Sequence, residues 1–298
     1  MKISYPEAVK RGWSYEDVFV VTFSELDYYV KELLIVYPNG AINNIPEYAL
    51  QIFKKMLNMW ESMHILYSHN QDYVSICTLC RSILDNLAII NHIYLDPNLT
   101  ELTIKHYLYI LDGVNARLKI MEEETIYDGS ITCDDYMALQ KHRLEIKESD
   151  EIVRKFILKE LSKFEFIDLS IIEQTNWRYK TLYPNSPKRD NKVSWKTLYQ
   201  KIDSRPFFKE LMNDLSVYVH GLSLSNIGYK KEDETFEPLF SLSIESIDAA
   251  IKAVKTIYKT EINKLNLDFK TSKSANLIKL SIKEEYLQTL NDIVINAN

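Results

Sequence analysis

The sequence predicts an all-α protein, a multi-helix bundle of long antiparallel helices with one irregular segment rich in basic and aromatic residues. Three observations support this prediction. The 298 residues include only 6 Gly and 8 Pro, whereas all-β sandwiches and Rossmann-type folds need far more turn residues. Apolar residues recur with the period of an α-helix through most of the chain. Helix-ending sequences such as Pro38-Asn39-Gly40 separate the periodic stretches.

The first half of the chain contains four periodic stretches. They predict helices over residues 14–37, 46–67, 73–95 and 99–124. The third stretch is apolar nearly all round, and a helix of that kind is normally buried. We therefore expect it to be the central helix of the fold.

The second half begins with a long acidic helix, expected at residues 134–164, and an irregular stretch, residues 165–193. Further helices are predicted over residues 194–202, 206–227, 239–265 and 276–295. Pro206 suits the first turn of its helix. Residues 1–266 are predicted to form a single helical domain, and residues 267–298 a polar linker and a C-terminal helix. A helix on a polar tether often packs on another chain, so a homo-oligomer or a partner protein is expected.

The composition is that of a folded protein without general affinity for polyanions. Hydrophobic residues make up 46% of the chain and charged residues 26%, and the formal net charge is −6. Nonspecific binding to nucleic acid needs a positive surface, which argues against a general nucleic-acid coat protein but leaves room for a local basic site. Cys77, Cys80 and Cys133 have no disulfide-framework spacing, which favours a reducing, cytoplasmic location. No signal core and no run of about 18 apolar residues is found, so no membrane span is expected.

Arg81 and Asp85 are the first candidate site. They lie four residues apart on the third predicted helix, a spacing at which an ion pair forms readily. A charge inside an apolar helix is costly unless it is paired and hydrogen-bonded. The pair either holds neighbouring helices in register or contributes to a functional pocket, and the sequence leaves both interpretations open.

His220 is the second candidate. Asn213, Ser216 and His220 fall on one stripe of the helix predicted over residues 206–227. That stripe either faces solvent or faces Arg81 and Asp85 across a cleft. In a cleft, His220 could act as an acid or base near neutral pH.

A third candidate is the stretch of residues 177–201, which carries a net charge of about +6 by residue count. Basic groups with interspersed rings suit single-stranded nucleic acid or a nucleotide, because cations bind phosphate and rings stack on bases. In the alternative, the rings anchor the loop in the core while the lysines stay solvated. The candidate nucleic-acid-binding residues are Trp177, Arg178, Lys180, Lys188, Arg189, Lys192, Trp195 and Lys196.

No motif predicts a metal site or a cofactor. Cys77 and Cys80 have CxxC spacing, but they lie within a predicted helix and have no second pair of ligands, so core cysteines are the better interpretation. No Walker loop, GxGxxG, HExxH or GxSxG sequence occurs.

Two segments together carry a resemblance. The first, residues 80–87, is Cys-Arg-Ser-Ile-Leu-Asp-Asn-Leu; the second combines the tryptophan of residues 195–199 with Leu-Ser-Val-Tyr-Val-His-Gly at residues 215–221. This combination resembles a group of uncharacterised prokaryotic helical proteins placed near the HEPN superfamily, over about residues 45–260. The resemblance implies RNA binding in stress response or phage defence, with an Arg preceding a His on one helix in the ribonucleases of that superfamily. Here Asn213 and Asp214 stand where the arginine would be expected, which counts against ribonuclease activity.

Two functional hypotheses follow. In the first, the protein binds RNA or a nucleotide through residues 177–201, with Arg81, Asp85 and His220 forming a polar pocket. If it is catalytic, His220 would serve as acid or base and Arg81 would stabilise phosphate charge. In the second, the protein is a non-enzymatic scaffold that assembles through its C-terminal helix.

Overall fold

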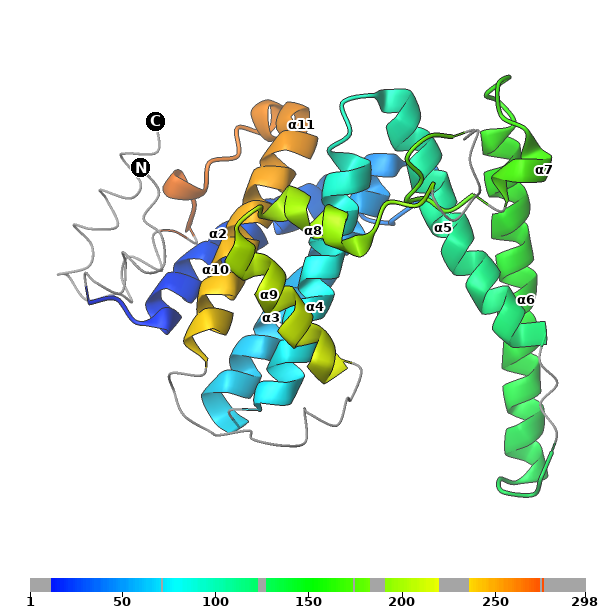
Figure 1. Cartoon of the computed structure of the whole chain (residues 1–298), viewed down its shortest axis with the longest axis horizontal. Helices are drawn as coiled ribbons and strands as arrows, with labels where there is room; N and C mark the ends of the chain where they lie inside the picture. The colour runs from blue at the N-terminus through cyan, green and yellow to red at the C-terminus, as the bar shows by residue number, and fades with distance from the viewer. Residues whose placement is uncertain are drawn as a thin grey trace. The chain divides into compact units, whose positions relative to one another are not determined.

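The structure is a computed structural model that describes residues 12–70, 72–122, 127–173, 175–182, 191–219, 236–273 and 275. Within these ranges the chain forms ten α-helices, one π-helical turn and one 3-10 turn, and the helices pack with antiparallel contacts (Figure 1). The same ranges contain no β-strand, only an isolated antiparallel bridge between Tyr179 and Lys192. The predicted all-α fold is confirmed.

The internal contacts divide the chain into two compact units. Unit 1 combines Met1–Leu95 with Trp195–Asn298, and unit 2 is Asp96–Ser194. The single domain expected for residues 1–266 stays a prediction. The C-terminal helix expected at residues 276–295 lies outside the described residues.

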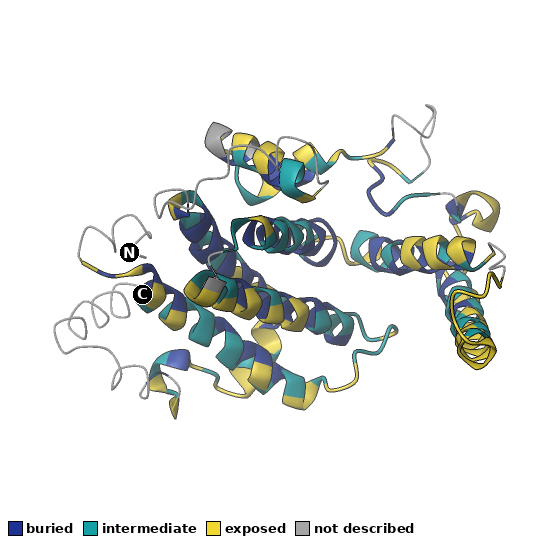
Figure 2. Ribbon diagram, turned by 90° about the horizontal axis from the view of Figure 1, so that it is seen from below, coloured by how far each residue is buried: buried dark blue, intermediate teal, exposed yellow. Residues whose placement is uncertain are grey.

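Unit 1 contains most of the predicted helices close to their expected bounds. Its helices are α2 (Tyr15–Val36), α3 (Ile45–Asn70), α4 (Tyr73–Ile89), α8 (Trp195–Ile202), α9 (Pro206–Val219), α10 (Glu237–Ile257) and α11 (Lys259–Lys264). Figure 2 shows buried residues along the helix sides that face one another. As expected, α9 begins at Pro206.

Helix α4 is the central helix of unit 1. It packs against α3, α8, α9 and α10, and it continues into a π-helical turn, η1 (Ile90–Tyr94). The segment Tyr73–Tyr94 is the one candidate for a membrane span, by length and composition, that the described residues contain. In its most apolar window 56% of the residues are buried inside the structure, as in the core helix of a soluble protein.

Local signals account for the two ends of α2. Ser14 caps its start, because its Oγ accepts from the backbone N–H of Asp17 while its own N–H donates to the Asp17 carboxylate. Beyond its end, Gly40 adopts a φ of +68°, and an added Cβ would lie 2.7 Å from Cγ of Gln51. Glycine is therefore favoured by the backbone conformation, and a larger residue would also displace the side chain of Gln51.

Unit 2 is built on a helical hairpin of α5 (Leu99–Glu122) and α6 (Cys133–Leu161), followed by the short α7 (Leu169–Ile172). Asp150 of α6 is buried at 2% exposure. Arg117 of α5 donates to both of its carboxylate oxygens, from Nε at 2.6 Å and from Nη2 at 2.5 Å. This bidentate pair joins the two helices and leaves the buried charge paired.

Candidate functional site

Arg81 and Asp85 form the predicted ion pair on α4. Nε of Arg81 donates to Oδ1 of Asp85 at 3.2 Å. The side chains are 16% and 35% exposed, respectively. The pair is thus shielded but still in contact with solvent, on a helix whose remaining residues are mostly buried.

Two other helices fix the guanidinium of Arg81. From α9, the backbone carbonyl of Met212 accepts from Nη1 at 3.0 Å and Oγ of Ser216 accepts from it at 2.5 Å. From α8, the ring of Tyr199 lies with its centroid 4.8 Å from Cζ of Arg81, and its hydroxyl donates to the carboxylate of Asp85. Residues more than a hundred positions apart in sequence therefore hold one cation in place.

A pocket of about 410 Å³ opens beside this cluster, between α4, α8 and α9. Arg81, Tyr199 and Ser216 form part of its wall. Trp195 and Lys196, from the first turn of α8, line it as well. The rings of Trp195 and Tyr199 are stacked, with centroids 5.7 Å apart and an angle of 20° between planes. The pocket thus combines a fixed cation with an aromatic wall.

The cations of the pocket differ in how many of their donors are used. Arg205 donates to Asp203 through Nε at 2.7 Å and also binds Glu245 of α10. Arg81 is paired with Asp85, but its Nη2 donates no hydrogen bond to the described residues. Lys196 is exposed and forms no ion pair within the described ranges. Nη2 of Arg81 and the amino group of Lys196 are therefore available to donate hydrogen bonds to a ligand.

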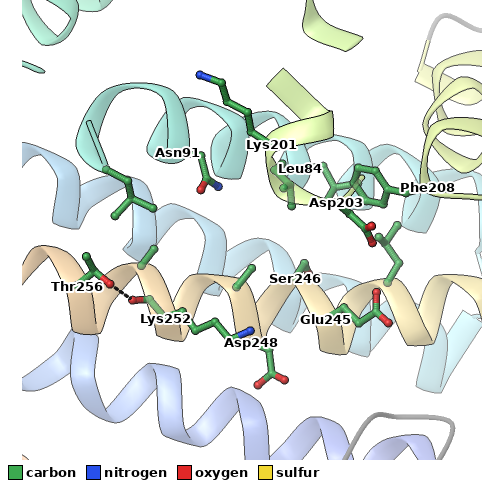
Figure 3. Close-up of a pocket in the computed structure, with 15 residues that line it drawn as sticks. Leu84, Asn91, Lys201, Asp203, Phe208, Glu245, Ser246, Asp248, Lys252 and Thr256 are labelled. Atoms are coloured by element: carbon green, nitrogen blue, oxygen red, sulfur yellow. Dashed lines mark hydrogen bonds between the residues drawn. The ribbon is translucent and has the colours of Figure 1, made fainter. Parts of the chain in front are cut away.

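A second cavity of about 370 Å³ lies between α8, η1 and α10, and it shares Asp203 and Phe208 with the first (Figure 3). Its wall carries three carboxylates against two lysines. One lysine, Lys201, contacts Nδ1 of His92 at 3.3 Å, and Figure 3 shows its amino group pointing away from Glu245. This cavity is less suited to an anion than the Arg81 pocket.

The basic stretch of residues 177–201 is divided between the two units. In unit 2 the rings of Trp177 and Tyr179 are each only 4% exposed. Trp177 packs edge-on against Tyr109 with centroids 5.4 Å apart, and the Tyr179 hydroxyl donates to Glu101 at 2.6 Å. Arg178 is also buried, at 9% exposure. These rings anchor the segment, so they present no face on which a base could stack.

The remaining candidates of this stretch have different surroundings. Lys180 and Lys192 of unit 2 are exposed. Trp195 and Lys196 belong to unit 1 and line the Arg81 pocket. Lys188 and Arg189 lie outside the described residues. Among the described members of the predicted set, those of α8 are the ones that line the pocket beside the ion pair.

Other sequence candidates can also be placed. His220 lies outside the described residues, so its predicted contact with Arg81 stays a prediction. Ser216, from the same predicted stripe, does face Arg81. Cys77 and Cys80 are free and buried, and burial raises the pKa of Cys77 to about 12. The described residues contain no group of three or more His, Cys, Asp or Glu side chains that could hold a metal ion.

The sequence alone did not identify Tyr199 and Arg205 as parts of the site. Tyr199 was one of several rings in a basic stretch, and its role depends on a contact with α4 that periodicity does not reveal. Comparison of the chain with protein-family models, with curated proteins and with solved structures found no match. The geometry of this pocket is therefore the feature of the protein that indicates a function.

Proposed function

We propose that unit 1 binds a nucleotide, either free or as the end of a single-stranded RNA, in the pocket between α4, α8 and α9. The observation that carries the proposal is the guanidinium of Arg81. It is held by Asp85, Ser216 and the carbonyl of Met212, while its Nη2 remains available at the pocket wall. A guanidinium fixed in this way is suited to phosphate, because little side-chain entropy is lost on binding.

Two further features support a nucleotide over a simple anion. Trp195 lies at the pocket wall, stacked on Tyr199, and aromatic rings are the usual platforms for nucleobases. A volume of about 410 Å³ is within the usual range of pockets for small ligands. In this assignment Arg81 and Lys196 bind the phosphate and Trp195 contacts the base.

The resemblance to HEPN-like proteins extends the proposal to a cytoplasmic role in RNA metabolism, such as stress response or phage defence. Asn213 and Asp214 stand where the ribonucleases of that superfamily carry an arginine, which counts against RNA cleavage. If the protein does cleave RNA, His220 would serve as acid or base and Arg81 as the phosphate-binding cation. Cleavage of a single-stranded RNA by the full chain, measured beside His220→Ala, tests this second step. Equal rates for the two proteins would remove His220 from the mechanism.

Binding is tested by calorimetric titration of the full chain with AMP, ATP and a short oligoadenylate. Replacing Lys196 with Ala should weaken binding about tenfold, because a charge-assisted hydrogen bond is lost. Arg81→Lys should weaken it at least as much, since the fork of the guanidinium is lost while the charge remains. Binding to the intact chain should also weaken as salt is raised.

Lys180→Ala is the matched control for Lys196→Ala, because Lys180 is an exposed lysine of the same basic stretch but belongs to unit 2. We expect Lys180→Ala to bind AMP as the parent does. If Lys180→Ala and Lys196→Ala weaken binding equally, the ligand does not use the Arg81 pocket. Failure of all three ligands to bind, together with oligomers lost on deletion of residues 276–298, would instead favour the scaffold hypothesis.

A further inference from the structure

Helix α6 of unit 2 carries an exposed face with a regular pattern. Three of its apolar side chains are largely in solvent: Met137 is 60% exposed, Leu144 56% and Ile152 68%. Charged residues, also exposed, alternate with them at spacings of three and four. In order, the α6 face consists of Asp134, Met137, Lys141, Leu144, Glu148, Ile152 and Lys155.

This face lies on the side of α6 opposite to its contact with α5. Each residue advances about 100° around a helix, so the seven positions fall within a stripe about 80° wide. The buried residues of α6 are Asp150, Ile157 and Leu161, and the same periodicity places them about half a turn away. Helix α6 therefore has two faces with apolar residues, and α5 covers one of them.

The spacing of the α6 face is that of a helix–helix seam. Its steps are of three or four residues, with two steps of four in succession between Leu144 and Ile152, and steps of this size keep side chains in line along a partner helix. Its apolar residues do not form a continuous hydrophobic patch, because charged residues separate them. A partner for this face must therefore supply opposite charges at matching intervals.

We propose that the α6 face pairs antiparallel with the α6 face of a second copy of this chain. With the two-fold axis between Leu144 and Glu145, Lys141 lies opposite Glu148 of the second copy, and Asp134 opposite its Lys155. The same register sets Met137 against Ile152 and brings the two Leu144 side chains together at the centre. Each of the four charged residues named thus lies opposite a residue of the other sign, and each of the three apolar residues named meets another.

The self-complementary pattern selects a second copy over other occupants. A two-fold interface requires that if one residue contacts another, the reverse contact also occurs, and four residue pairs of α6 satisfy this in a single register. The charges are available for such pairing. Lys141 has only a long contact of 4.0 Å with Glu145, in which both side chains are more than half exposed, and such pairs stabilise a helix little. Asp134, Glu148 and Lys155 form no ion pair with a described residue.

Sedimentation velocity of the full chain over a range of concentrations tests the proposal. We expect a reversible dimer. Leu144→Glu should raise its dissociation constant at least about tenfold, because it places two carboxylates together at the centre. Lys141→Glu and Glu148→Lys should each weaken the dimer, since each brings like charges into contact twice.

A charge exchange separates this register from a general loss of stability. The double variant Lys141→Glu, Glu148→Lys should regain the dimer. The two single variants, mixed, should form a heterodimer detectable by native mass spectrometry. Lys54→Glu is the matched control, because Lys54 is an exposed lysine of α3 in unit 1; it should leave the dimer unchanged.

Three results would overturn the proposal: a monomer at all concentrations, a dimer unaffected by Leu144→Glu, or a double variant as weak as the single ones. A dimer lost on deletion of residues 276–298 but not with Leu144→Glu would assign assembly to the C-terminal helix instead. Nucleotide binding is measured separately at the Arg81 pocket of unit 1, so the two proposals can fail independently.

Discussion

The hydroxyl of Tyr199 on α8 donates a hydrogen bond to the carboxylate of Asp85 on α4. The same ring lies over the guanidinium of Arg81. Tyr199 therefore contacts both members of the ion pair, and it is itself only 6% exposed. The position of α8 against α4 is in this way linked to the orientation of the cation.

Replacing Tyr199 with Phe keeps the ring over Arg81 and removes the hydroxyl. We expect a loss of about 1 kcal/mol in the free energy of unfolding, because the Asp85 carboxylate loses one donor. Urea denaturation measures this loss. Tyr109→Phe is a matched control, since the Tyr109 hydroxyl makes no hydrogen bond with the described residues. Equal losses for the two variants would show that the Tyr199 hydroxyl has no special role.

Arg117→Ala should destabilise the hairpin of unit 2. The change leaves the buried carboxylate of Asp150 without its two charge-assisted hydrogen bonds. We expect a loss of about 2 kcal/mol, below the value for a fully buried pair, because the Arg117 side chain is 55% exposed. Hydrogen exchange of the α5 and α6 amides measures it.

The control for Arg117 is a pair of the same unit whose carboxylate is less buried, since the Glu160 side chain is 19% exposed against 3% for Asp150. Lys163 binds Glu160 at 2.6 Å, and its side chain is 62% exposed. Lys163→Ala should cost less than about 0.5 kcal/mol, as surface ion pairs usually do. If Lys163→Ala costs as much as Arg117→Ala, burial of Asp150 does not determine the value of its pair.

Thiol reactivity should distinguish the three cysteines. Burial raises the pKa of Cys77 to about 12 and that of Cys80 well above its usual range, so both stay protonated at pH 8. Cys133, at the start of α6, is exposed. Ellman's reagent should therefore modify a single thiol in the folded chain and none in Cys133→Ser. Rapid modification of folded Cys133→Ser at pH 8 would contradict the buried positions of Cys77 and Cys80.

Tyr37 predicts a pH dependence of stability. Burial, followed by its hydrogen bond to Glu261, raises the pKa of Tyr37 to about 12, from about 10 in an unfolded chain. The fold favours the neutral hydroxyl, so this contribution is complete below pH 10 and is lost as the pH rises toward 12. Tyr37→Phe should be less stable than the parent at pH 8, and the difference should shrink by pH 11. A constant difference over this range in chemical denaturation would contradict the assignment.

The sequence predicted the fold well because the period of its apolar residues indicates which side of each helix is buried. The apolar positions of α4 recur at helical spacing, and they are the residues that α3, α9 and α10 bury. The sequence failed where a tertiary contact ends an element. One helix was expected over residues 239–265, yet α10 ends at Ile257 and α11 begins at Lys259. Between them Tyr258 is buried, and its hydroxyl donates to the carbonyl of Pro46 at 2.7 Å, a contact that local sequence does not reveal.

Helical spacing also predicted part of the site. The spacing of Arg81 and Asp85 along one helix was sufficient to predict their pairing. The stripe containing Ser216 left two orientations open, and only the packing of α9 against α4 decides between them for this residue. The basic stretch was a less reliable guide to the site. Charge and aromatic content do not distinguish a ring that is exposed for stacking from one that is buried, as Trp177 is.

The discontinuity of unit 1 has a consequence for the order in which the protein is made. Unit 2 is a single continuous stretch of chain, so all of it is translated before α8 and α9. Until α8 and α9 have been translated, Arg81 of the nascent α4 lacks its contacts with Ser216 and Tyr199. The last part of the chain to be synthesised therefore completes the core that the first part begins, while unit 2 is free to fold ahead of both.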